Sequence, residues 1–327
     1  MKEFFDMKRT KQRLGIYTVL LFLLTAAAVA LKTAALLYNF NFKTNYFDDK
    51  LLSGISDALL IAGVLLSLSY VAVGRRDSLR ASFSSPAFYL PSGVIGVALL
   101  FFCGEHLASV FAKISVNMQS DFRLKIFTPE IAIELLAVLL ALASIGYFIL
   151  GSLVMGRRNV IRSAFGITVA LFLAIYAAYI YFDTSLPINA PIKILDEIAY
   201  VFAAVFFLYE TRISLGRDMW GAYLAFGMAT AILCAASSLP ALILYFVRGA
   251  VISISLTDSV LTAGLFVFTS SRILHALALR KDEKTPLAVV AEAVNERRCD
   301  NPEPSEPEEA DLEPDNYTMT FEETEGK

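Results

Sequence analysis

Long apolar runs, separated by short polar segments, occupy most of the chain. A helix needs about 20 apolar residues to cross a hydrocarbon core about 30 Å thick. This pattern predicts membrane-spanning helices wherever such a run occurs. Uncharged runs of about this length lie at Leu14–Leu31 (continuing past Lys32 to about Tyr38), Ala58–Gly74, Ala81–Gly104, Leu135–Gly156, Ser163–Phe182 and Met219–Val247.

Two further stretches, at about residues 195–215 and 254–279, are apolar in the middle but carry charged residues near each end. Charged side chains within a turn or two of a helix end can extend to the membrane interface. We therefore expect a helix in each stretch. The predicted fold is an all-α integral membrane bundle of about eight transmembrane helices over residues 1–280.

The composition agrees with this class, since 57% of the residues are hydrophobic, 18% are charged and the mean hydropathy is +0.60. A soluble domain carries about 25% charged residues, so the composition excludes a soluble enzyme domain. Residues 1–280 contain 23 Lys and Arg against 16 Asp and Glu, a net charge of +7. Residues 281–327 contain 5 against 15, a net charge of −10, and few aliphatic residues. We expect this second region to be an acidic, mostly disordered tail.

The distribution of Lys and Arg predicts the orientation. These residues concentrate in the N-terminal segment, in every second connection between predicted helices and after the last helix. Because cytoplasmic loops are enriched in Lys and Arg, we expect both termini to be cytoplasmic, which requires an even number of crossings. The short connections favour a bacterial plasma membrane.

The first predicted helix has an alternative interpretation. Basic residues, the apolar stretch Leu14–Leu24 and the tripeptide Ala28-Val29-Ala30 resemble a cleavable signal peptide. Cleavage would leave seven spans. The apolar run continues through Leu37, which is longer than a signal peptide requires, so we favour an uncleaved first helix.

Two predicted cytoplasmic connections share one arginine pattern, in which Gly-Arg-Arg is followed by a further arginine at the same spacing. Anionic lipid headgroups suit paired arginines. A duplicated two-helix hairpin would explain the shared pattern, and so would the general enrichment of arginine in cytoplasmic turns. We predict lipid-headgroup contacts for Arg75, Arg76, Arg80, Arg157, Arg158 and Arg162.

Signatures of catalysis are lacking in the sequence. It contains no phosphate-binding loop, no H-E-x-x-H, no G-x-S-x-G and no C-x-x-C. With only His106 and His275, histidine-rich metal or relay sites are excluded by count. We expect a non-enzymatic protein that has no cofactor and no nucleic-acid partner, and no sequence motif predicts a metal site.

Ionisable residues recur near the starts of the even-numbered predicted helices. They also occur toward the C-terminal ends of the first and third predicted helices, which face the same side of the membrane. The helix macrodipole stabilises an acid at a helix N-terminus by about 0.3–1 kcal/mol, which explains the acids without any function. Alternatively, because a charge buried in hydrocarbon needs a partner or water, these residues converge in an outward-facing vestibule. It would bind a divalent cation, a proton or a cationic substrate, with Lys32 as counter-charge. The candidate vestibule residues are Lys32, Asp57, Glu105, His106, Glu134, Glu197 and Asp258.

Aromatic residues close the fifth predicted helix at Tyr176, Tyr179, Tyr181 and Phe182. Amphipathic rings favour the headgroup level of a membrane, so we interpret them as an interfacial belt rather than as a tyrosine-lined ligand pocket. In the last helix, Arg272 is expected to anchor near Glu210 if the sixth and eighth helices adjoin.

Two classes of function fit these patterns. The first is a non-enzymatic sensor, accessory subunit or scaffold that presents its tail, residues 299–327 with Tyr317 as a docking position, to a cytoplasmic protein. Uninterrupted apolar helices and the separate tail favour it. The second is a small-molecule or ion transporter, which the acidic vestibule favours.

Overall fold

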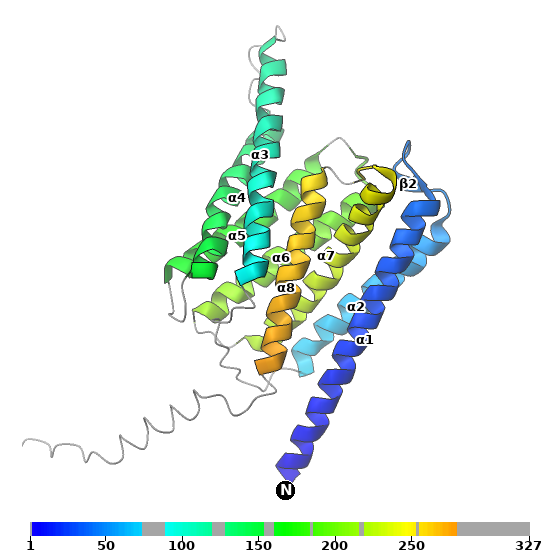
Figure 1. Cartoon of the computed structure of the whole chain (residues 1–327), viewed down its shortest axis with the longest axis vertical. Coiled ribbons are helices and arrows are strands. Elements are labelled where there is room, and N and C mark those ends of the chain that lie inside the picture. The colour runs from blue at the N-terminus through cyan, green and yellow to red at the C-terminus, as the bar shows by residue number, and fades with distance from the viewer. Residues whose placement is uncertain are drawn as a thin grey trace, which may run out of the picture. The chain divides into compact units, whose positions relative to one another are not determined.

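The computed structural model describes residues 2–73, 89–119, 128–153, 160–183, 186–215, 219–252 and 255–279. Within these ranges the chain forms helices and one short β-hairpin (Figure 1). The helices are α1 (Lys2–Tyr38), α2 (Lys50–Val73), α3 (Tyr89–Gln119), α4 (Pro129–Leu153), α5 (Val160–Phe182), α6 (Pro191–Ser214), α7 (Trp220–Arg248) and α8 (Leu256–Leu279).

Each apolar stretch predicted from the sequence overlaps one of these helices. The largest difference concerns α3, for which the uncharged run ends at Gly104 whereas the helix continues to Gln119. The helix passes through Glu105 and His106 without a break and includes Lys113. Charged residues end an apolar run in the sequence, but they do not end a helix when neighbouring helices supply partners for them.

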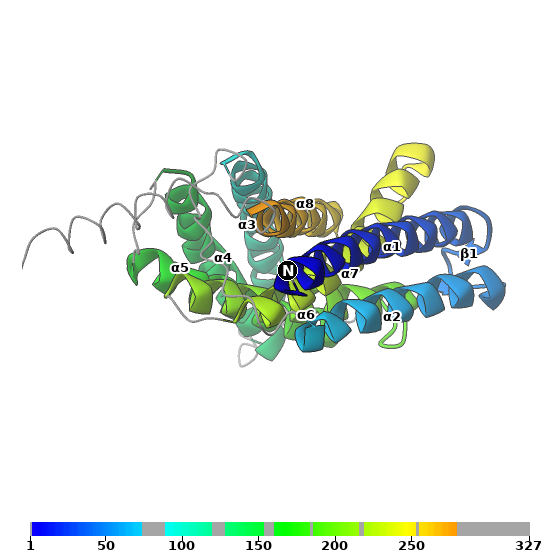
Figure 2. The ribbon, with the colours of Figure 1, turned by 90° about the horizontal axis from the view of Figure 1, so that it is seen from below.

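Helices α3 to α8 pack in a ring, in which each helix contacts the next along the chain and α3 contacts α8 to close the ring. Seen from below, α8 lies beside α3 (Figure 2). The contact is close at Gly264 of α8, where an added Cβ would lie 3.2 Å from Cγ1 of Ile95 in α3. This contact therefore joins two helices that are distant in the sequence.

Helices α1 and α2 form a hairpin that packs against α7 (Figure 1). A short pair of antiparallel strands joins the two helices. Strand β1 (Phe40–Asn41) lies opposite β2 (Tyr46–Phe47), with Phe40 paired with Phe47. Asn45 has a φ of 59° in this turn, a conformation that Asn tolerates better than most residues. Helix α1 runs unbroken through Ala28, whose carbonyl oxygen accepts a hydrogen bond of 3.0 Å from Ser56 Oγ. The uncleaved first helix stays a prediction.

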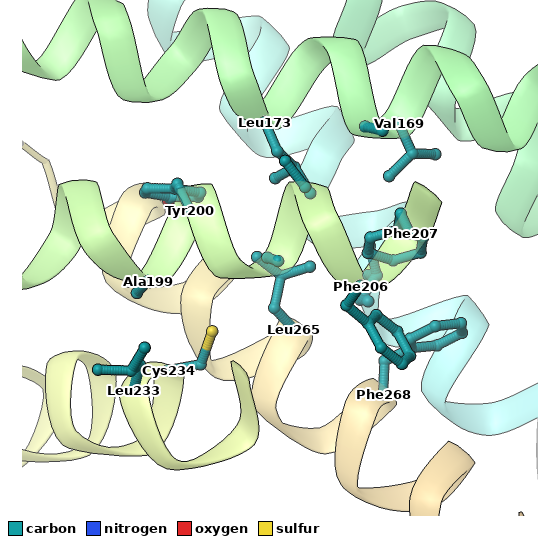
Figure 3. Close-up of a cluster of buried hydrophobic side chains, with 14 of the residues drawn as sticks. Val169, Leu173, Ala199, Tyr200, Phe206, Phe207, Leu233, Cys234, Leu265 and Phe268 are labelled. Atoms are coloured by element: carbon teal, nitrogen blue, oxygen red, sulfur yellow. The ribbon is translucent and has the colours of Figure 1, made fainter. Parts of the chain in front are cut away.

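The interior of the ring is filled by apolar and aromatic side chains (Figure 3). Phe207 of α6 and Phe268 of α8 stack with their ring centroids 5.6 Å apart, and Phe148 of α4 meets both of them edge to face. All three rings are buried. The middle of the bundle is therefore packed rather than open.

Seven of the described helices are long and apolar enough to cross a membrane. They supply the segments Tyr17–Tyr38, Lys50–Val71, Leu90–Met118, Pro129–Ile149, Ala164–Phe182, Trp220–Arg248 and Leu256–Leu277. Helix α6 is not one of them, because charged residues lie near both of its ends. The chain is thus a nearly all-helical protein with the character of a polytopic membrane protein.

Two groups of predictions fall outside the described part of the chain. One is the tail, residues 281–327 with Tyr317. The other is the set of arginines expected to contact lipid. Arg162 lies in the first turn of α5, but its side chain is not described, and neither are Arg75, Arg76, Arg80, Arg157 and Arg158.

Close packing predicts an effect of substitution at Gly227 in α7. An added Cβ there would lie 2.7 Å from Ile273 Cδ1 and 2.9 Å from Phe206 Cε2. Such overpacking costs about 1–3 kcal/mol, so we expect Gly227→Ala to lower the melting temperature in detergent. Gly54→Ala is the matched control, since an added Cβ meets nothing within 4 Å there. Equal melting temperatures for the two variants would contradict the prediction.

Candidate functional site

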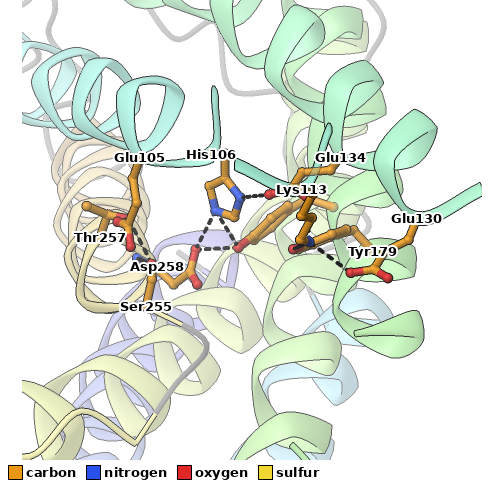
Figure 4. Close-up of polar contacts among 10 residues, drawn as sticks. Glu105, His106, Lys113, Glu130, Glu134, Tyr179, Ser255, Thr257 and Asp258 are labelled. Atoms are coloured by element: carbon orange, nitrogen blue, oxygen red, sulfur yellow. Dashed lines mark hydrogen bonds and ion pairs between the residues drawn. The ribbon is translucent and has the colours of Figure 1, made fainter. Parts of the chain in front are cut away.

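A group of polar side chains from four helices meets inside the ring near the starts of α4 and α8 (Figure 4). We call this group the polar cluster. Hydrogen bonds and ion pairs connect its members from one side of the ring to the other. Its members are His106 and Lys113 of α3, Glu130 and Glu134 of α4, Tyr176 and Tyr179 of α5, and Asp258 of α8.

His106 is the centre of the polar cluster. Its Nδ1 lies 3.0 Å from Oε1 of Glu134, and its Nε2 lies 3.2 Å from the hydroxyl of Tyr176 and 3.7 Å from Oδ1 of Asp258. The Tyr176 hydroxyl donates to the same Oδ1 of Asp258. One imidazole ring, buried against Phe102, therefore links α3 to three other helices.

Lys113 connects the buried part of the cluster to its surface edge. The ammonium lies 2.8 Å from Glu130 Oε1, 2.8 Å from Glu134 Oε2 and 3.5 Å from the Tyr179 hydroxyl. The side chain of Glu134 is only 1% exposed, whereas those of Lys113 and Glu130 are 32% and 35% exposed. The cluster thus has one edge at the exposed surface of the bundle.

Asp258 lies on the opposite side of the cluster. Its backbone N–H donates to Ser255 Oγ, which caps the start of α8. Its Oδ2 is buried and has no hydrogen-bond partner among the described residues. Tyr200 of α6 lies beside it, with its hydroxyl 3.5 Å from the Asp258 carbonyl oxygen and 3.0 Å from Thr262 Oγ1. An unsatisfied buried carboxylate oxygen is costly, so the carboxylate depends on the donors at Oδ1.

The candidate vestibule residues do not all come together. His106, Glu134 and Asp258 meet in the polar cluster. Glu105 is exposed at its edge, where it accepts a hydrogen bond from Thr257.

Lys32 is buried and pairs at 2.8 Å with Asp57 in the α1–α2 hairpin, so it is not the counter-charge of the polar cluster. That role belongs to Lys113. Glu197 of α6 is half-buried and makes no described contact with the cluster; its Oε1 is buried without a hydrogen-bond partner in the described part of the chain.

The macrodipole accounts for only some of these acids. Glu130 and Asp258 lie in the first turns of α4 and α8. Helices α2, α4 and α6 begin earlier than the apolar runs predicted, so Asp57, Glu134 and Glu197 lie beyond the first turn. The effect is confined to about one turn, so these three acids need another explanation.

Four members of the cluster escaped the sequence analysis as candidates: Lys113, Glu130, Tyr176 and Tyr179. The belt interpretation is wrong for Tyr176 and Tyr179, which are buried, whereas Tyr181 and Phe182 are exposed. The helical spacing of Glu130 with Glu134, and of Tyr176 with Tyr179, would have indicated shared faces. Continuing α3 beyond Gly104 would have placed Lys113 two turns from His106.

A second buried ion pair lies toward the other end of α8. Arg272 Nη2 is 2.8 Å from Oε1 of Glu210, and Tyr147 donates a hydrogen bond of 2.7 Å to the same oxygen. This contact between α8 and α6 is the one expected from the sequence. The guanidinium also lies over the ring of Phe268, 5.1 Å from its centroid. The described part of α8 therefore has a buried charge near each end.

The side chains present restrict the ligands of the polar cluster. Within the described ranges, no group of three or more His, Cys, Asp or Glu side chains has an arrangement that could hold a metal ion. Comparisons with known protein families, curated proteins and solved structures find no match to this chain.

Proposed function

We propose that this protein is a non-enzymatic membrane sensor whose input is the polar cluster and whose output passes along α8 to the acidic C-terminal segment. The observation that supports it is the place of the cluster in the ring. His106 and Asp258 join α3 to α8, the two helices whose contact closes the ring. A change in charge there acts directly on that contact.

Helix α8 is suited to carry the change. Asp258 and Arg272 are 14 residues apart, which is about 21 Å along a helix. Both are buried and charged, and both are held by side chains of other helices. Residue 281, where the acidic segment begins in the sequence, follows Arg272 by only nine positions. A shift of α8 at Asp258 would therefore reach the segment that we assign to partner binding.

The membrane topology belongs to the same proposal. We assign a crossing to α6 as well, because it packs between α5 and α7 and is 24 residues long. Eight crossings place both termini in the cytoplasm, the tail beside its protein partner and the polar cluster toward the outside. The bias of Lys and Arg supports this orientation, with a bacterial plasma membrane as the location.

Exchange of amide hydrogens tests the route along α8. Asp258→Asn removes the charge that pairs with His106, and losing a hydrogen bond to a charged group costs about 1.5–3 kcal/mol. We expect about tenfold or faster exchange along α8 past Arg272, and altered exchange in residues 281–298, for the full chain in nanodiscs. Asp57→Asn, an acid of the α1–α2 hairpin that also pairs with a buried cation, is the matched control and should leave α8 unchanged. A change confined to the first two turns of α8 would contradict the proposal.

A transporter is the second candidate, and the Glu210–Arg272 pair is the observation that favours it. Polar contacts near both ends of α8, with packed phenylalanines between them, resemble two closed gates. A transporter would carry a solute or an ion across proteoliposome membranes, and Glu134→Gln would abolish that flux. A sensor would show no flux while still coupling Asp258 to residues beyond Arg272.

A further inference from the structure

The hydrogen bonds of His106 identify the species that the polar cluster binds. On one side, Nδ1 faces Oε1 of Glu134, and the other oxygen of this carboxylate is held by Lys113. A carboxylate so placed beside an ammonium is ionised and can only accept. Nδ1 therefore carries a hydrogen.

On the other side, Nε2 faces the hydroxyl oxygen of Tyr176 and Oδ1 of Asp258. The single hydroxyl hydrogen of Tyr176 goes to Asp258. What remains toward Nε2 is a lone pair of Tyr176 and a carboxylate oxygen, both acceptors. Nε2 must therefore also carry a hydrogen, and a ring with hydrogens on both nitrogens is a cationic imidazolium.

From this arrangement we propose that the polar cluster is a proton-binding site, with His106 as the group that holds the proton. The inference rests on the proposed function, because it names the input of the same site. The proton comes from bulk water and returns to it. We assign its route to the edge of the cluster where Lys113 and Glu130 are exposed.

The charges around His106 explain why a proton is bound there. In the polar cluster the three acids Glu130, Glu134 and Asp258 outnumber Lys113, which is the cation besides His106. Among the described residues, Asp258 has no ion-pair partner except His106. The proton thus supplies the positive charge that Asp258 otherwise lacks. The titratable and charged groups that face this region are Glu105 and Lys113 of α3, Glu130 and Glu134 of α4, Tyr176 and Tyr179 of α5, Asp196 and Tyr200 of α6, and Asp258 of α8.

Loss of the proton changes the contact between α3 and α8. A neutral His106 with a bare Nε2 accepts a hydrogen bond, and the nearest donor is the Tyr176 hydroxyl. If that hydroxyl turns to Nε2, Asp258 loses the donor at Oδ1 while Oδ2 already has none. A buried carboxylate with no donor is strongly unfavourable, so the start of α8 must move or take up water.

Nitrogen NMR of the imidazole tests the proposal directly. The chain has two histidines, so His275→Gln leaves His106 as the only ring in full-length protein labelled with ¹⁵N-histidine. At pH 7 we expect hydrogens on both ring nitrogens of His106. In an Asp258→Asn background we expect most molecules to lose one of them, whereas Asp57→Asn, which is remote from the cluster, should keep both.

Two outcomes would overturn the proposal: a ring with a single hydrogen at pH 7, or a doubly protonated ring that Asp258→Asn leaves unaffected. If Asp258→Asn does not fold, Tyr176→Phe replaces it, because this change removes the hydroxyl between Nε2 and Asp258 and should shift the proton occupancy. The NMR signal reports the ring itself and needs no output from α8. A neutral ring therefore rejects the proton as ligand, whereas unchanged hydrogen exchange beyond Arg272 rejects the sensor.

Discussion

Replacing Glu134 by Gln is expected to lower the free energy of unfolding by about 3–5 kcal/mol, the usual cost of removing one partner of a buried ion pair. Glu134 is 1% exposed and accepts from both His106 and Lys113. Gln keeps the size of the side chain but removes its charge, so His106 loses the carboxylate at Nδ1. Equilibrium unfolding in bicelles measures the difference.

Glu130→Gln is the matched control for this prediction. Glu130 lies one turn earlier on α4 and pairs with the same Lys113 at the same distance of 2.8 Å, but its side chain is 35% exposed. An ion pair accessible to water contributes about 1 kcal/mol or less, so we expect a small loss of stability. Similar losses for the two variants would show that burial of Glu134 is not what makes it important.

The positions of the helices were predictable because an apolar run of membrane length has few other stable structures. Their ends were less predictable. The run ends at Gly104 because Glu105 and His106 are polar, but α3 continues since Glu134, Tyr176 and Asp258 provide partners for His106. These partners come from three other helices, so they cannot be identified from the sequence of α3 alone.

The polar cluster was partly predictable, because polar residues are conspicuous in apolar sequence. The acids and His106 were noticeable because they interrupt apolar sequence, and the structure brings His106, Glu134 and Asp258 together. Tyr176 and Tyr179 were not noticeable, since a tyrosine near a helix end is typical of a membrane interface. Lys32 pairs with Asp57, one of the candidate acids, but it does not reach Glu134 or Asp258, because the α1–α2 hairpin packs on α7, outside the ring of helices. Which helices adjoin decided each of these outcomes.

The other large effect is expected at the far end of α8, where Arg272→Met should lower the free energy of unfolding by about 3–5 kcal/mol. The guanidinium of Arg272 is 2% exposed and lies 2.8 Å from Glu210. Met keeps most of the apolar stem and leaves the Glu210 carboxylate in the interior without its cation. Equilibrium unfolding in bicelles again measures the loss.

The double variant Arg272→Met with Glu210→Leu separates pairing from packing. Replacing both members of a buried ion pair by apolar residues is often neutral or stabilising, so the double variant should recover most of the lost stability. If it is as unstable as Arg272→Met alone, the pair is not the cause. If the double variant is stable but no longer transmits the effect of Asp258→Asn to residues 281–298, the ion pair serves transmission. In that case the Arg272–Glu210 pair holds α8 to α6 in one register, so that a change at the polar cluster moves α8 as a unit.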